Sequence, residues 1–225
     1  MAGPAVIFVG PSLRPPRPAA PPGARYAPPA ARGDVLAAAE RGARVIGLID
    51  GVFHQDLAVT PREVRAAAAT GAHLFGGASM GALRACDCPG AITGVGEIYA
   101  RLAAGELTDD DEVAVAFDPV SHELAAYPLV QIREAARAAA AAHPGAGTGT
   151  AAGEALRRFV EAARGLPFHD RTPEQLRRAA GPVEAAGIPW RELAGWLDAP
   201  SSDLKRRDAL AVVAAVAAAL ADDRR

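Results

Sequence analysis

Three apolar runs, separated by helical patterns, dominate the first third of the chain. None of the runs alternates apolar with polar residues, which is typical of strands buried on both faces of a parallel sheet. The order strand, helix, strand, helix, strand therefore predicts an α/β fold with right-handed crossovers. The predicted strands are AVIFVG (5–10), RVIGLID (44–50) and HLFGG (73–77).

Capping signals mark the helices that connect and follow these strands. Asp34 is the expected N-cap of one helix, which should end at Gly42. The sequence Thr60-Pro61-Arg62-Glu63 has the pattern of a capping box with proline at the first helical position, so we expect a helix over 61–70. A third helix should follow Ser79.

The pattern becomes helical in the second half of the chain. We expect an α/β core over residues 1–142, a flexible connector over 143–153 (HPGAGTGTAAG) and a helical portion over 154–225. A proline-rich stretch from Pro15 to Pro29 should form a surface loop, since it cannot be a helix or a central strand. The predicted fold is a small parallel sheet with a β-α-β-α-β core and a helical C-terminal portion packed against it.

Composition excludes several classes of protein. The formal net charge of −2 gives no general attraction to nucleic acid or to an anionic membrane. The longest apolar run, 209–221, is shorter than the roughly 20 residues of a membrane span. The AVIFV run is too short for a secretory signal, and Cys86 and Cys88 form no disulfide framework. We therefore expect a cytoplasmic protein.

Three polar turns follow the three predicted strands. They contain Gly10-Pro11-Ser12, Asp50-Gly51 and Gly77-Ala78-Ser79-Met80-Gly81. Ligands of open parallel sheets bind beyond the carboxyl ends of the strands. The shared edge of these turns is therefore the predicted functional site.

Ser79 has three interpretations on this edge: a nucleophile, a helix cap or an anion-binding hydroxyl. Its surroundings match G-x-S-x-G between a strand and a helix, the setting of a nucleophile elbow. In the catalytic interpretation the Met80 amide donates to an oxyanion. A second donor could come from the turn that contains Gly10 and Ser12.

A serine nucleophile needs a base, and two are available. His54 follows Asp50 on the correct edge, which makes a Ser79–His54–Asp50 set one alternative. The other base is Lys205, the only lysine among 24 Lys and Arg residues, and arginine cannot lose its proton in a protein. Burial and a helix N-terminus would favour the neutral amine of Lys205.

The position of Lys205 on its helix supports its burial. With about 100° per residue, Lys205 shares a face with an apolar stripe, whereas Arg207 and Asp208 should point away from it. A lysine that extends along an apolar face toward water is the alternative. The stripe consists of Ala209, Val212, Val216 and Leu220.

Two further clusters have structural as well as functional interpretations. The run Asp109–Glu112 suits either a divalent cation or a solvated or partner-binding surface. Cys86-Asp87-Cys88 has no second Cys/His pair at ligand spacing, which favours two ordinary thiols. The glycines match neither a Walker loop nor G-x-G-x-x-G, so nucleotide binding is not expected.

With these residues considered, the sequence resembles TfuA-like proteins. The resemblance extends along nearly the whole chain and keeps the order of the shared stretches. Where these proteins usually continue with an alanine-glutamate-leucine type of sequence after GALRA, this chain has Cys86-Asp87-Cys88. The stretches are VIFVGPSL (6–13), PPAARGD (28–34), IGLIDGVF (46–53), GASMGALRA (77–85), GVGEIY (94–99), DDDEVAVAF (109–117) and LKRRDAL (204–210).

The resemblance implies a sulfur-delivery partner of a YcaO enzyme in peptide backbone thioamidation. The implied substrate is the C-terminal thiocarboxylate of a ThiS-like, ubiquitin-fold carrier, which is hydrolysed to release sulfide. The implied catalytic pair is Ser79 and Lys205, and we expect Asp50 and Arg84 to orient groups around it. ATP and Mg would belong to the YcaO partner, which also binds the precursor peptide, and this chain would need no cofactor.

Two alternatives remain at the level of sequence. A non-catalytic adaptor would dock the carrier and the YcaO enzyme, with Ser79 as a helix cap. An esterase would use the Ser79–His54–Asp50 set on small esters, although the sequence has no obvious apolar lid segments.

Overall fold

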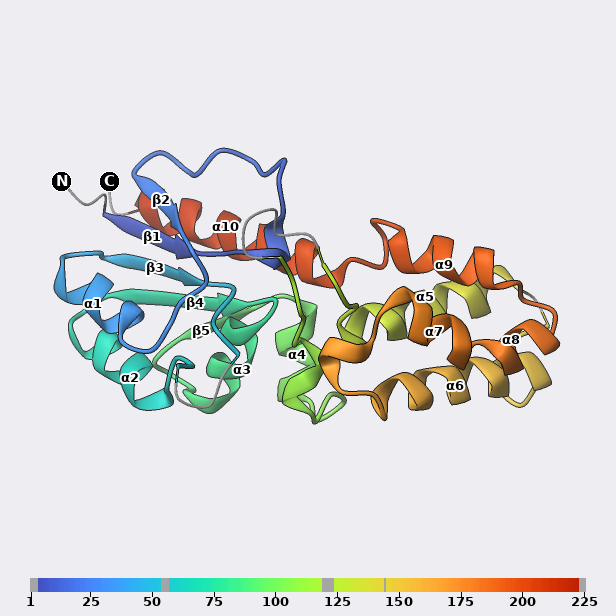
Figure 1. Cartoon of the computed structure of the whole chain (residues 1–225). Helices are drawn as coiled ribbons and strands as arrows, with labels where there is room; N and C mark the ends of the chain where they lie inside the picture. Colours follow the sequence, from blue (N-terminus) through green and yellow to red (C-terminus); the bar gives the residue numbers. More distant parts are fainter. Residues whose placement is uncertain (1–3, 54–56, 119–123, 144, 223–225) are drawn as a thin grey trace. The chain divides into compact units, whose positions relative to one another are not determined.

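The computed structural model describes residues 4–53, 57–118, 124–143 and 145–222. The chain forms two compact units, which Figure 1 shows in sequence colours. The first, the α/β unit, contains residues 1–108 and 205–225, and the second, the helical unit, contains residues 109–204. No helix in the described part of the chain combines the length and apolar character that a membrane crossing requires.

A parallel sheet is the centre of the α/β unit. Among the described residues it has five strands in the order β2-β1-β3-β4-β5. In open sheets of this order, ligands bind beyond the carboxyl ends of the strands, where β1 and β3 lie side by side. The strands are β1 (Ala5–Phe8), β2 (Ala24–Ala27), β3 (Val45–Leu48), β4 (His73–Gly77) and β5 (Thr93–Val95).

Helices cover both faces of the sheet, which confirms the predicted α/β class. Val6 and Phe8 pack with three helices on one face, whereas Ala5 and Ile7 pack with a single helix on the other (Figure 1). The alternation follows from the period of two along a strand. The three helices are α1 (Asp34–Glu40), α2 (Pro61–Ala69) and α3 (Met80–Asp87), and the single helix is α10 (Leu204–Asp222).

Glycines show the direction in which α10 crosses its face. A Cβ on Gly77, at the carboxyl end of β4, would lie 2.8 Å from a methyl group of Val212. A Cβ on Gly47, within β3, would lie 3.1 Å from Val216. The helix therefore runs opposite to the strands, and its first turn lies at the carboxyl edge of the sheet.

The predicted helix start at Thr60 is confirmed, but only half of the capping box forms. The Thr60 hydroxyl accepts a hydrogen bond from the Glu63 amide at 3.2 Å. The Glu63 carboxylate does not return to Thr60; it accepts from the amides of Val35 at 2.9 Å and Leu36 at 3.4 Å. Glu63 thus caps α1, and Asp34, the predicted N-cap, is the first residue of that helix.

The proline-rich stretch contains one strand that we expected to be loop. β2 pairs with β1 alone and lies at the edge of the sheet, where its second side needs no partner. Its four residues contain no proline, so each can take part in the ladder. Short segments β5 and η1 (Pro11–Leu13) complete the α/β unit together with α4 (Glu97–Ala103).

The helical unit has its own hydrophobic core, with Phe159 and Leu193 among its fully buried residues. The predicted boundaries at 142, 153 and 154 differ from the units of the structure, because the apolar face of α5 packs in this core while α10 packs on the sheet. The predicted connector also contains the start of α6. The elements are η2 (Asp110–Glu112), α5 (Leu129–Ala142), α6 (Ala151–Arg164), η3 (Phe168–Asp170), α7 (Pro173–Ala179), α8 (Gly181–Ala185) and α9 (Trp190–Asp198).

Candidate active site

Asp50 joins two of the three predicted turns at the carboxyl edge. It follows β3, is 2% exposed, and accepts hydrogen bonds at Oδ2 from the amides of Gly10 at 2.8 Å and Ser12 at 3.0 Å. The Ser12 hydroxyl donates to Oδ1 at 2.6 Å. The structure therefore brings these three residues together, between β1 and β3, as the order of the strands predicts.

The same contacts correct the role that we expected for the Gly10–Leu13 turn. The amides of Gly10 and Ser12 donate to Asp50, and the Leu13 amide donates to the Gly10 carbonyl at 3.2 Å. Pro11 has no N–H group. In residues 10–13, all of which the structure describes, no amide is left for an oxyanion, and Asp50 instead fixes the shape of the turn.

A strained turn carries Ser79 out of β4. The Ser79 amide donates to the Gly77 carbonyl at 2.7 Å, which closes a three-residue turn around Ala78. Ala78 has a φ of 63°, and it is the one non-glycine residue with positive φ in the described part of the chain. Such a conformation costs on the order of 1–3 kcal/mol and clusters at functional sites. In this turn the left-handed residue precedes the serine.

Ser79 is at the N-cap position of α3, but its hydroxyl does not cap the helix. The residue is 6% exposed, and its carbonyl accepts from the amides of Ala82 and Leu83. The Gly81 amide donates to the Ile49 carbonyl at 3.2 Å. Within the described residues the Met80 amide donates to no other group. The cap interpretation of Ser79 is therefore wrong, and the predicted oxyanion donor at Met80 is available.

Lys205 lies at the same edge, in the first turn of α10, and is 4% exposed. Its neighbour Arg206 donates to the carbonyls of Arg14 at 3.3 Å and Pro16 at 3.4 Å, in the segment that follows β1. These hydrogen bonds hold one side of the first turn of α10 near the carboxyl end of β1.

Asp208 holds the other side of that turn, toward β5. Its carboxylate accepts from the amides of Glu97 at 3.0 Å and Ile98 at 2.7 Å, at the start of α4. Asp208 is 4% exposed, so our expectation that it points away from the buried stripe is wrong, whereas Arg207 is half-exposed. Because β3 and β4 lie between β1 and β5, the backbone of Lys205 lies above the ends of the strands that carry Asp50 and Ser79.

Arg84 is directed away from the Ser79 end of its helix. Its guanidinium pairs with Asp87, one turn further along α3, at 2.9 Å. Its Nε is buried without a hydrogen-bond partner among the described residues. Arg84 therefore points toward the carboxyl end of α3. Among the described residues it makes no contact that would orient groups around Ser79.

The two thiols behave as ordinary cysteines. Both are free, and the Cys88 thiol is buried and lies 3.5 Å from the Pro61 carbonyl. Burial raises the pKa of Cys88, and burial together with the Asp87 carboxylate raises the pKa of Cys86. Since the thiolate is the reactive form, these shifts favour the interpretation of two ordinary thiols.

The structure does not test the esterase alternative. His54, its proposed base, lies outside the described residues, as does His122. His73 begins β4 at the opposite edge of the sheet, as predicted. His143 pairs with Glu192 in the helical unit at 3.0 Å.

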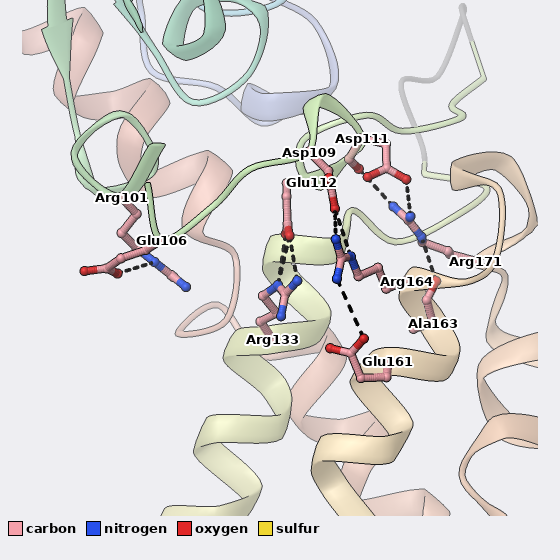
Figure 2. Close-up of polar contacts among 10 residues, drawn as sticks. All are labelled: Arg101, Glu106, Asp109, Asp111, Glu112, Arg133, Glu161, Ala163, Arg164 and Arg171. Atoms are coloured by element: carbon pink, nitrogen blue, oxygen red, sulfur yellow. Dashed lines mark hydrogen bonds and ion pairs between the residues drawn. The ribbon is translucent and has the colours of Figure 1, made fainter. Parts of the chain in front are cut away.

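The acidic run is tied to arginines of the helical unit, as Figure 2 shows. Glu112 is buried and receives hydrogen bonds from Arg133 of α5 at 2.7 and 3.1 Å. Asp109 pairs with Arg164 at 2.7 Å, and Asp111 pairs with Arg171. No group of three potential metal ligands occurs among the described residues. The structure thus favours an anchoring role over the cation site.

Arg171 provides a prediction about stability. It is fully buried and donates to the carbonyls of Ala163 at 3.0 Å and Asp111 at 2.9 Å, besides its ion pair. Removing one partner of a buried pair costs about 3–5 kcal/mol. Because the Asp111 side chain is 36% exposed, we expect the substitution Arg171→Met to lower the free energy of unfolding by about 2–4 kcal/mol.

Urea unfolding followed by tryptophan fluorescence measures this loss, since Trp190 and Trp196 both lie in α9 of the helical unit. Arg164→Met is the matched control: its pair with Asp109 is 44% and 38% exposed, so we expect a loss of at most about 1 kcal/mol. Equal losses in the two variants would contradict the anchoring role of Arg171.

The fold and this edge define an α/β protein with an open parallel sheet and buried polar residues beyond its carboxyl ends. Comparison with protein families takes the assignment further, because the family model described as TfuA-like protein matches residues 50–172. This range covers more than half of the 225 residues, and the chain belongs to the TfuA-like family. Comparison with curated proteins finds no match.

The matched range contains Asp50, Ser79 and the acidic run, whereas Lys205 lies beyond it. Membership confirms the family to which the sequence motifs pointed. It is consistent with a role in biosynthesis related to thioamidation.

Proposed function

We propose that this protein hydrolyses the C-terminal thiocarboxylate of a ThiS-like carrier and so supplies sulfide to a YcaO-type enzyme for peptide backbone thioamidation. One observation carries the proposal. Ser79 lies at the N-terminus of α3 with a hydroxyl that does not cap the helix, beside a Met80 amide that donates to no described group. The only lysine of the chain lies in a helix turn above the same edge.

The reaction begins with neutral Lys205 accepting the Ser79 proton. The Ser79 oxygen attacks the carbonyl carbon of the thiocarboxylate, and negative charge develops on the carbonyl oxygen. The Met80 amide and the positive end of the α3 dipole stabilise this oxyanion. Collapse of the intermediate breaks the C–S bond, and the sulfur leaves as sulfide with a proton from Lys205.

Water completes the cycle by hydrolysing the acyl-serine ester. Lys205, neutral again, accepts a proton from the attacking water and passes it to the Ser79 oxygen as the ester bond breaks, so that both residues return to their starting states. The carrier leaves with a C-terminal carboxylate. The net reaction is thiocarboxylate plus water to carboxylate plus hydrogen sulfide, so no oxidant, reductant or cofactor of this chain takes part. ATP and Mg would act in the YcaO-type enzyme on the precursor peptide.

The supporting role of Asp50 follows from its contacts. It accepts three hydrogen bonds from Gly10 and Ser12, and we infer that it keeps the turn after β1 in place beside the reacting groups. With no amide free in that turn, Met80 is the one backbone donor that we assign to the oxyanion.

Incubation of the purified protein with a carrier thiocarboxylate tests the proposal. We expect sulfide to accumulate without a YcaO-type enzyme or ATP, and the carrier mass to fall by the difference between sulfur and oxygen. A carrier that ends in a carboxylate is the control and should give no sulfide. If sulfur leaves an otherwise stable carrier only when the YcaO-type enzyme and ATP are added, the protein is a docking adaptor instead.

A further inference from the structure

Two buried carboxylates of the α/β unit cap a helix other than their own. Glu63 of α2 accepts from the amides of Val35 and Leu36 in the first turn of α1, at 2.9 and 3.4 Å. Asp208 of α10 accepts from the amides of Glu97 and Ile98 in the first turn of α4, at 3.0 and 2.7 Å. Asp208 uses one oxygen for each amide, whereas Glu63 uses Oε1 for both. Of the two carboxylates, only Asp208 is on the helix of Lys205.

The cap at Asp208 requires glycine beside it. Gly96 has a φ of 95°, and a Cβ on it would lie 2.5 and 2.7 Å from the carboxylate oxygens of Asp208. Val95, the preceding residue, pairs with Gly77 in the sheet, two residues before Ser79. Asp208 therefore fixes α10 at a point one strand away from the Ser79 turn.

The cap also fixes the turn of α10 that contains Lys205. Three residues of helix rise about 4.5 Å, so residues 205 and 208 are neighbours on one side of the helix. Arg206 holds the opposite side of the same turn through the carbonyls of Arg14 and Pro16. Lys205 lies between two anchors, and of these the Asp208 cap has the shorter hydrogen bonds and is the more buried.

We propose that Asp208 is a positioning residue for Lys205. By binding the start of α4, Asp208 holds the first turn of α10 in the place from which the Lys205 amine can act on Ser79. The inference rests on the proposed function, because it assigns Lys205 the role of the base. Asp208 contacts neither the substrate nor the reacting atoms. Asp208 affects the reaction only because it determines the position of the first turn of α10.

Asp208→Asn tests this role with little risk to the fold. Burial raises the pKa of Asp208; the Ile98 and Glu97 amides and Arg207 oppose this rise, and the Glu97 charge adds to it. The neutral amide removes the desolvation penalty of the buried anion but can accept only one of the two amide hydrogen bonds. Glu63→Gln is the control, since it removes the charge of a buried carboxylate that caps a helix away from Lys205.

The readout uses the fact that Lys205 is the only lysine. Protein labelled with isotopic lysine gives one lysine side-chain signal by NMR, recorded for wild type and both variants. In Asp208→Asn we expect this signal to move toward that of free lysine, and kcat for sulfide release to fall roughly 10- to 100-fold with little change in KM. In Glu63→Gln the signal and kcat should stay as in wild type.

Each other result overturns the inference. It fails if the Lys205 signal of Asp208→Asn stays in place, if the signal moves while kcat is unchanged, or if Glu63→Gln has the same effects. If wild type releases no sulfide, the proposed function fails on its own. The lysine signal then still shows whether Asp208 positions Lys205.

Discussion

Ser79→Ala is expected to abolish sulfide release from the carrier thiocarboxylate. Without the serine oxygen no acyl-enzyme can form, and we expect the rate to fall by about 10³-fold or more. The fold should be retained, because the Ser79 hydroxyl does not cap α3 and its loss removes no cap. Sulfide release and the midpoint of thermal unfolding, measured on the same preparation, distinguish a loss of catalysis from a loss of the fold.

Ser202→Ala is the matched control for this substitution. Ser202 is also a buried serine at 1% exposure, and its hydroxyl has no hydrogen-bond partner among the described residues. We expect its activity to equal that of wild type. A fluorophosphonate probe should label wild type and Ser202→Ala but not Ser79→Ala. If Ser79→Ala releases sulfide at the wild-type rate, another group is the nucleophile.

The sheet was predictable because its strands are buried on both faces. The runs that became β1, β3 and β4 are continuous and apolar, and each ends at a glycine or polar turn. β2 and β5 were not predicted because they lie at the two edges of the sheet. An edge strand needs fewer apolar residues, so its sequence differs less from that of a loop.

The site was predictable as a location but not as a set of hydrogen bonds. Parallel strands bring their carboxyl ends together, so Asp50 had to lie near Gly10 and Ser12. The sequence cannot show that Asp50 occupies the amides of that turn, because two amides and one carboxylate can be arranged in several ways. Only the three-dimensional geometry distinguishes an oxyanion donor from a turn that is already satisfied.

Asp208 and the acidic run show why charged residues are hardest to assign. Helical periodicity places a charge on the exposed side unless a distant partner compensates its burial. For Asp208 the compensation comes from amides at residues 97 and 98, more than a hundred positions away. For Asp109, Asp111 and Glu112 it comes from Arg164, Arg171 and Arg133 of the helical unit. No local pattern records such partners.

Lys205→Arg is expected to reduce sulfide release by about 10²- to 10⁴-fold, the usual contribution of a general base. The substitution places a permanent positive charge at residue 205, because a guanidinium does not lose its proton in a protein. Arginine can therefore still attract the anionic thiocarboxylate, but it cannot accept the Ser79 proton. Measurement of kcat and KM separates these contributions, and we expect the loss in kcat.

The pH dependence provides a second test of Lys205. In wild type the rate should rise with pH as the Lys205 ammonium loses its proton, whereas Lys205→Arg should show no such rise. Lys205→Met, which fits the buried position without the bulk of arginine, should be equally inactive at every pH and show that the loss is not steric. Arg207→Ala, on the half-exposed side of the same helix, should keep the wild-type profile. An active Lys205→Met variant would mean that Ser79 is activated by another group, and the arrangement of α10 above the sheet edge would then need a different explanation.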